Sequence, residues 1–271
     1  MPEKGALHAA RATMVVTYVV AAVAAMAAAL APVPRSWQYS HALYYEGLIL
    51  VSAYMCLLIG AVVLLLMGAG AYKAELKRAY LAMCAGIMLV ALGCVQLPVL
   101  GIFNLWGSAW VNNGFVGVPF FVSGLVLYIG VRRLALLIGQ AGLLTRFVVV
   151  VPLVIVLCVA LAFVPHVHVT FAERDFDIAY GIFMWSAVFT VIATVLLARI
   201  QRDIGQHYQS AMAWLCSGVG NVAVALILVI VGGFVSNKTQ DNWSIAIDVA
   251  GLAAGLTLVH AGYVFTKTKE Y

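Results

Sequence analysis

The stretch from Ala79 to Val131 contains no Lys, Arg, Asp or Glu, and this feature restricts the fold more than any other. A transmembrane helix needs about 20 predominantly apolar residues, so the stretch is long enough for two bilayer crossings. Hydrophobic residues make up 65% of the whole chain and charged residues 9%, whereas soluble domains average about 45–50% and about 25%. These proportions exclude a water-soluble globular protein.

Apolar runs of the length of a bilayer crossing recur along the chain. They are continuous and lack the apolar and polar alternation of a β-barrel strand, so in lipid they predict helices that satisfy their own backbone hydrogen bonds. The sequence therefore predicts an all-α integral membrane protein. Its eight transmembrane helices are expected near residues 12–31, 47–69, 79–102, 113–131, 146–165, 178–198, 211–235 and 244–265.

The basic residues test this number of spans, because Lys and Arg collect on the cytoplasmic side of membrane proteins. With eight spans, twelve of the 15 Lys and Arg residues fall on one side and only Arg35, Arg174 and Lys238 on the other. Both termini are therefore predicted to be cytoplasmic. The net charge of +5 is interpreted as this topology signal, and nucleic-acid binding is disfavoured. The basic tail and the lack of a targeting peptide fit the plasma (inner) membrane of a prokaryote.

A six-residue sequence occurs twice, as ALAPVP at residues 29–34 and as ALAFVP at residues 160–165. The first copy also fits the cleavage site of a secretory signal, but the second copy, in the middle of the chain, opposes that interpretation. Each copy follows an apolar run and ends in a proline, which stops a helix. We therefore interpret both copies as helix ends.

The similarity between the two parts of the chain continues beyond the hexamer. Tyr45-Glu46-Gly47 corresponds to Ala179-Tyr180-Gly181, Gly86 to Gly220, and Ser123-Gly124-Leu125 to Ala250-Gly251-Leu252. We infer two tandem four-helix repeats, residues 1–140 and 141–271. Because each repeat has an even number of spans, the copies have the same, parallel orientation, and the axis that relates them runs along the membrane normal.

Ionisable side chains within a membrane are costly and are functional candidates by default. Asp248 lies about one turn inside the last span, and Glu46 lies at the exoplasmic end of the second. Uncharged polar candidates are Gln96 in the third span and Asn221 in the middle of the seventh. These four are the predicted ligand-binding residues. For Asp248 we expect a solvated side chain at the interface in preference to a buried one.

The segment after the fifth predicted span contains the densest polar cluster of the exoplasmic side. His166 and His168 project to the same face of an extended segment, and Asp177 or another nearby acid completes a set of ligands for copper or zinc. A solvated loop needs no metal, and the His-x-His spacing is a weak signal. The metal site is therefore the third hypothesis for the function.

Several functions are disfavoured by missing residues. Paired histidines for haem are absent from the spans, no span contains a lysine for a retinal Schiff base, and no catalytic residues can be named, which favours a non-enzymatic role. The leading hypothesis is an accessory or scaffold subunit of a larger membrane complex, in contact with bound lipid and other subunits. The alternative is a small transporter or ligand-binding module for a small or lipid-like molecule, with an exoplasmic site between the repeats.

Overall fold

The computed structural model describes residues 3–33, 41–69, 74–103, 118–139, 175–204, 206–232 and 240–267. Within these ranges the chain is helical apart from a few residues at helix ends, and it contains no strand. The helices of this part of the chain are α1 (Glu3–Ala29), α2 (His41–Ala69), α3 (Ala74–Phe103), α5 (Val118–Leu137), α7 (Asp175–Asp203), α8 (Gln206–Gly232) and α9 (Gln240–Lys267).

Each of these seven helices coincides with a predicted span and is long and apolar enough to cross a membrane. The protein is thus a multi-pass helical membrane protein. Most helices extend past the predicted spans, because polar turns continue the helix beyond the apolar section. The fifth predicted span, 146–165, lies outside the described residues.

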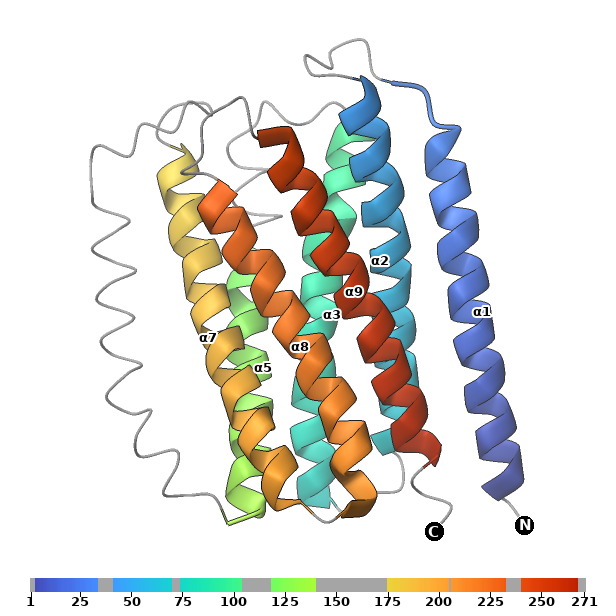
Figure 1. Cartoon of the computed structure of the whole chain (residues 1–271), viewed down its shortest axis with the longest axis vertical. Coiled ribbons are helices and arrows are strands. Elements are labelled where there is room, and N and C mark those ends of the chain that lie inside the picture. Colours follow the sequence, from blue (N-terminus) through green and yellow to red (C-terminus); the bar gives the residue numbers. More distant parts are fainter. Residues whose placement is uncertain are drawn as a thin grey trace.

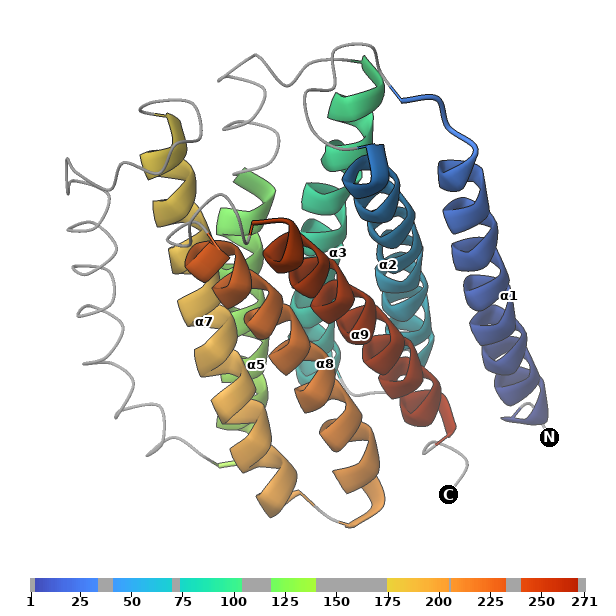
Figure 2. The same ribbon diagram turned by 45° about the horizontal axis from the view of Figure 1, so that its top comes forward.

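Six of the helices form a closed ring in which each packs against two neighbours, in the order α2, α3, α5, α7, α8 and α9, with α9 returning to α2 (Figure 1). Helix α1 stands outside this ring. It packs on α2, with a smaller contact to α9, and both views show it at the edge of the bundle (Figure 2). Its apolar face, which includes Val16, Val20 and Val23, is about half exposed, as suits contact with lipid.

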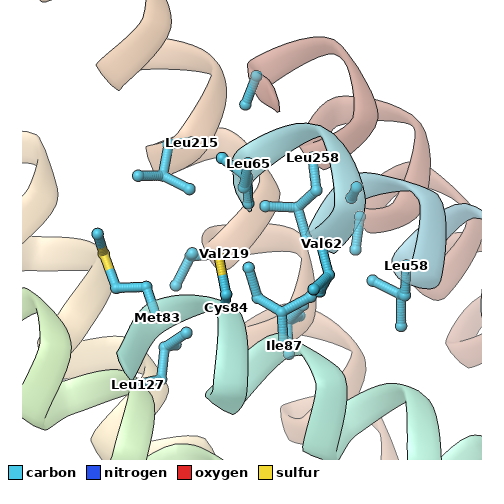
Figure 3. Close-up of a cluster of buried hydrophobic side chains, with 14 of the residues drawn as sticks. Leu58, Val62, Leu65, Met83, Cys84, Ile87, Leu127, Leu215, Val219 and Leu258 are labelled. Atoms are coloured by element: carbon cyan, nitrogen blue, oxygen red, sulfur yellow. The ribbon is translucent and has the colours of Figure 1, made fainter. Parts of the chain in front are cut away.

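Aliphatic side chains fill the middle of the ring (Figure 3). Leu58 and Leu65 of α2, Ile87 of α3, Leu215 of α8 and Leu258 of α9 are each 2% exposed or less. They belong to one continuous buried cluster to which all six ring helices contribute. The described helices therefore enclose a packed core at this depth.

Small residues allow the helices to approach closely. A Cβ atom at Gly255 of α9 would lie 2.7 Å from Cβ of Leu57, and one at Gly262 would lie 2.6 Å from Cβ of Leu64. Both contacts are to α2, and Gly251 faces Tyr54 of the same helix. The Gly251-x-x-x-Gly255 motif is therefore used for packing within the chain, as is common in membrane helices.

The helix ends show how the bundle is oriented. Helix α1 starts and α9 finishes at the same end of the bundle (Figure 1). Every Lys and Arg of the described helices lies toward this end, which we call the basic end: Lys4, Arg11, Lys77, Arg78, Arg132, Arg133, Arg199, Arg202 and Lys267.

The first copy of the repeated hexamer is a helix end, as predicted. Helix α1 stops at Ala29, and the amides of Leu30 and Ala31 bond to carbonyl oxygens three residues back, at 3.2 and 3.1 Å. The second copy, at residues 160–165, lies outside the described residues.

Candidate functional site

Asp248 is the one carboxylate that is buried among the described side chains, with 8% of its surface exposed. It lies in the third turn of α9, toward the end of the bundle opposite the basic end. A Cβ atom at Gly47 of α2 would lie 3.7 Å from its Oδ2 atom. The carboxyl group thus faces α2, at a place where α2 has no side chain.

The expectation of a solvated Asp248 is therefore wrong. Its place near the start of the apolar run suggested access to water, but the side chain points toward α2 rather than away from the ring. The position of a residue along a helix fixes its depth, whereas the packing of neighbouring helices decides whether it is covered.

Two further polar groups lie beside Asp248. The hydroxyl of Tyr54 in α2 and the thiol of Cys94 in α3 lie close to each other and to Asp248. Tyr54 is 7% exposed and Cys94 4%. Gly251, one turn after Asp248, makes room for the Tyr54 ring, because a Cβ there would lie 3.2 Å from the ring atoms.

No positive charge accompanies this group of side chains in the part of the chain that the structure describes. Asp248 has no ion pair or hydrogen bond there, and the Lys and Arg residues of the described helices lie toward the other end of the bundle. An ionised carboxylate away from water is stable only when it is paired. The site therefore suits a bound proton or a ligand that brings a positive charge or a hydrogen-bond donor.

The junction between α5 and α7 contains polar and aromatic side chains instead of a charge. The hydroxyls of Ser123 and Ser186, both fully buried, lie 3.4 Å apart. Nearby, the ring of Trp185 stacks on Phe121 with centroids 5.2 Å apart and meets Phe189 at 4.7 Å. The buried indole N–H of Trp185 has no acceptor among the described residues.

The other predicted ligand-binding residues do not join Asp248 in one site. Glu46 is exposed near the start of α2. Asn221 is partly exposed on α8, between exposed Ser217 and Val224 on the same helix face. Gln96 lies in α3, but its side-chain surroundings are outside what the structure describes.

The predicted metal site falls mostly outside the described residues. His166 and His168 are not among them, and Asp177 belongs to the first turn of α7 with a side chain that is not described. Among the described side chains, no three His, Cys, Asp or Glu groups lie close enough to hold a metal ion. The copper or zinc hypothesis therefore stays a prediction.

Sequence reasoning did not single out Tyr54, Cys94 or Trp185 for the site. Each lies in an apolar run where aromatic and thiol side chains are ordinary core residues. Four of the five cysteines are described, and all four are free thiols: Cys56, Cys84, Cys94 and Cys216. Only the proximity of Tyr54 and Cys94 to a buried carboxyl group distinguishes them, and that depends on the packing of α9 against α2 and α3, which are distant from it in sequence.

Comparisons with known proteins found no relative of this chain. The chain matches no family model, no curated protein and no solved structure.

Proposed function

We propose that the protein is a small membrane transporter or ligand-binding module whose site contains Asp248 and lies between two halves of the bundle. The observation that carries this proposal is the buried carboxyl group at the contact between α2 and α9, without a cationic partner in the described part of the chain. Such a group is costly in a membrane and is retained where it binds something.

The order of helices in the ring supports the division of the bundle into two equivalent halves. If α2, α3 and α5 correspond to α7, α8 and α9, exchanging the two sets maps the ring of contacts onto itself. Helix α5 ends at the basic end and α7 begins at the opposite end (Figure 1), which is compatible with the span predicted from the sequence at 146–165 and with the proposal of two four-helix repeats. The contacts of α2 with α9 and of α5 with α7 are then the two junctions between the repeats.

The register of the helix contacts supports the same correspondence. The proposed repeat makes Gly86 equivalent to Gly220 and Gly124 equivalent to Gly251. In the same alignment Gly218 of α8 corresponds to Cys84 of α3, and Thr257 of α9 corresponds to Gly130 of α5. In the α8 and α9 pair, a Cβ at Gly218 would lie 3.2 Å from Oγ1 of Thr257. In the α3 and α5 pair, a Cβ at Gly130 would lie 2.8 Å from the backbone nitrogen of Met83. The alignment places Gly130 opposite Cys84, whereas its neighbour in the structure is Met83. The two helix pairs therefore differ by one residue in register.

Parallel repeats in transporters place their substrate sites at the repeat interface. Asp248 lies at such a junction, and the equivalent residue at the other junction is Phe121, which stacks on Trp185. One junction therefore offers a charge and the other an aromatic surface. We infer that the basic end is cytoplasmic, from the positive-inside rule, and that the ligand enters from the exoplasmic side.

The accessory-subunit hypothesis rests on a different observation. The apolar face of α1 is exposed along most of its length, which suits contact with either lipid or a neighbouring protein. Because a buried unpaired carboxyl group is not required for such a role, we rank it second. Activity of the purified, reconstituted chain on its own would count against it.

The test uses methylammonium as a small cationic probe, with the full chain purified and reconstituted into liposomes. Asp248→Asn keeps the size of the side chain and removes its charge, so methylammonium uptake or binding should fall roughly tenfold or more, since a hydrogen bond to a charged group contributes about 1.5–3 kcal/mol. Glu46→Gln, an exposed carboxylate on the adjacent α2 helix, is the matched control and should leave the signal unchanged. Equal signals from wild type and Asp248→Asn, or no signal from wild type, would contradict the proposal.

A further inference from the structure

The outward face of α8 contains polar side chains at the depth of the lipid chains. Asn221 lies ten residues from Val231 and thirteen from Tyr208, the two ends of the apolar part of the helix. At about 1.5 Å per residue, its carboxamide is about 15 Å or more along the helix from either end. Lipid headgroups and water are therefore out of its reach.

Asn221 faces away from the ring. Ser217, four residues before it, is exposed, and Val224, three residues after it, is 46% exposed. Residues at these spacings share one face of a helix. Trp214, a further turn toward the basic end, is 38% exposed on the same face. We call the stripe of Trp214, Ser217, Asn221 and Val224 the α8 outer face.

The polar groups of this face are not satisfied within the chain. Neither Ser217 nor Asn221 has a side-chain hydrogen bond in the part that the structure describes. Several hydroxyls of the other spans differ, since they donate to carbonyl oxygens three or four residues back: Thr13 at 2.9 Å, Thr17 at 2.8 Å, Thr190 at 2.7 Å, Thr194 at 2.8 Å and Thr257 at 2.7 Å. A carboxamide cannot remain unpaired in hydrocarbon without a cost, so a partner is required.

We propose that the α8 outer face is the contact surface of a dimer of this chain, in which Asn221 pairs with Asn221 of a second copy. A carboxamide has both a donor and an acceptor, so two copies related by a twofold axis satisfy each other, as a self-complementary interface requires. Ala213 and Ser217 lie one turn apart on the same side of α8 and are small enough for two helix backbones to approach. Asn side chains bond across membrane helices in the same way.

The experiment counts subunits of the full chain in lipid bilayers by single-molecule photobleaching, over a range of protein-to-lipid ratios. Wild type should be dimeric at ratios where Asn221→Leu is mainly monomeric. Asn221→Gln keeps the amide and should retain most of the dimer. Ile129→Ala is the matched control, because Ile129 is also an exposed isoleucine, at 37%, but lies on α5, which does not adjoin α8 in the ring; it should behave as wild type.

A second measurement locates the contact surface. Ser217→Cys should form a disulfide between two copies on mild oxidation in the bilayer, whereas Ile129→Cys of α5 should not; the native cysteines are present in both variants. The proposal is overturned if wild type is monomeric at every ratio, if Asn221→Leu dimerises as well as wild type, or if Ile129→Cys alone cross-links. Capture of a different polypeptide by monomeric wild type, with its loss in Asn221→Leu, would also overturn it in favour of an unlike partner.

Discussion

At the scale of single residues, Gly86 decides how closely α3 and α5 pack. A Cβ atom there would lie 2.9 Å from the backbone nitrogen of Leu127 and 3.0 Å from its Cα. Because backbone atoms cannot rotate away, Gly86→Ala should lower the free energy of unfolding by about 1–3 kcal/mol. Unfolding in mixed micelles measures the effect. Gly5→Ala is the control, since no atom lies within 4 Å of a Cβ at that position; equal stability of the two variants would contradict this packing.

The candidate site was predictable from the sequence in part. A carboxylate inside an apolar run is recognisable, and Asp248 was identified in that way. Its burial was not, because covering it depends on Gly47 and on the side of α9 that faces α2. Asn221 illustrates another limit: its place near the middle of an apolar run is evident from the sequence, but its exposure on an outer helix face is not, since hydropathy does not say which face of a helix meets its neighbours.

At the scale of elements, α1 is held to the ring mainly by its contact with α2. Thr17 of α1 occupies the space left by Gly60 of α2, and the Thr13 hydroxyl lies 3.8 Å from the sulfur of Met67. Gly60→Leu should push α1 away from α2, because its side chain would occupy the position of Thr17. A disulfide between Thr13→Cys and Met67→Cys should then form several-fold more slowly, as measured by mass spectrometry of the linked peptides.

The control for this prediction is Leu66→Ala, on an exposed part of α2, which should leave the rate of cross-linking unchanged. Undiminished cross-linking in Gly60→Leu would show that α1 is positioned by something other than this contact.

The helices themselves were predictable from the sequence: the length of the apolar runs identified the seven helices that the structure describes. The arrangement of α1 outside a ring of six was not, because every run is apolar on most of its surface and none is marked as peripheral.

At the scale of the whole molecule, the packed core and the polar junctions occupy different depths. The aliphatic cluster around Leu58, Ile87 and Leu258 fills the middle of the ring (Figure 3), whereas Asp248 lies nearer the end opposite the basic one. A ligand bound at Asp248 therefore meets a closed layer below it. Transport by the proposed site requires the two proposed repeats to move relative to each other at their junctions, as in rocking transporters.

The orientation of the molecule gives the last prediction, because the proposed site must face the exoplasm. Glu46 and Arg132 are exposed at opposite ends of the bundle. With the basic end in the cytoplasm, Glu46→Cys should react with a membrane-impermeant maleimide in intact cells, and Arg132→Cys only after permeabilisation. Wild type without an added cysteine gives the background. Labelling of both positions from one side would contradict the bundle topology. Reversed labelling would keep the fold but turn Asp248 toward the cytoplasm, and a ligand would then have to enter from within the cell.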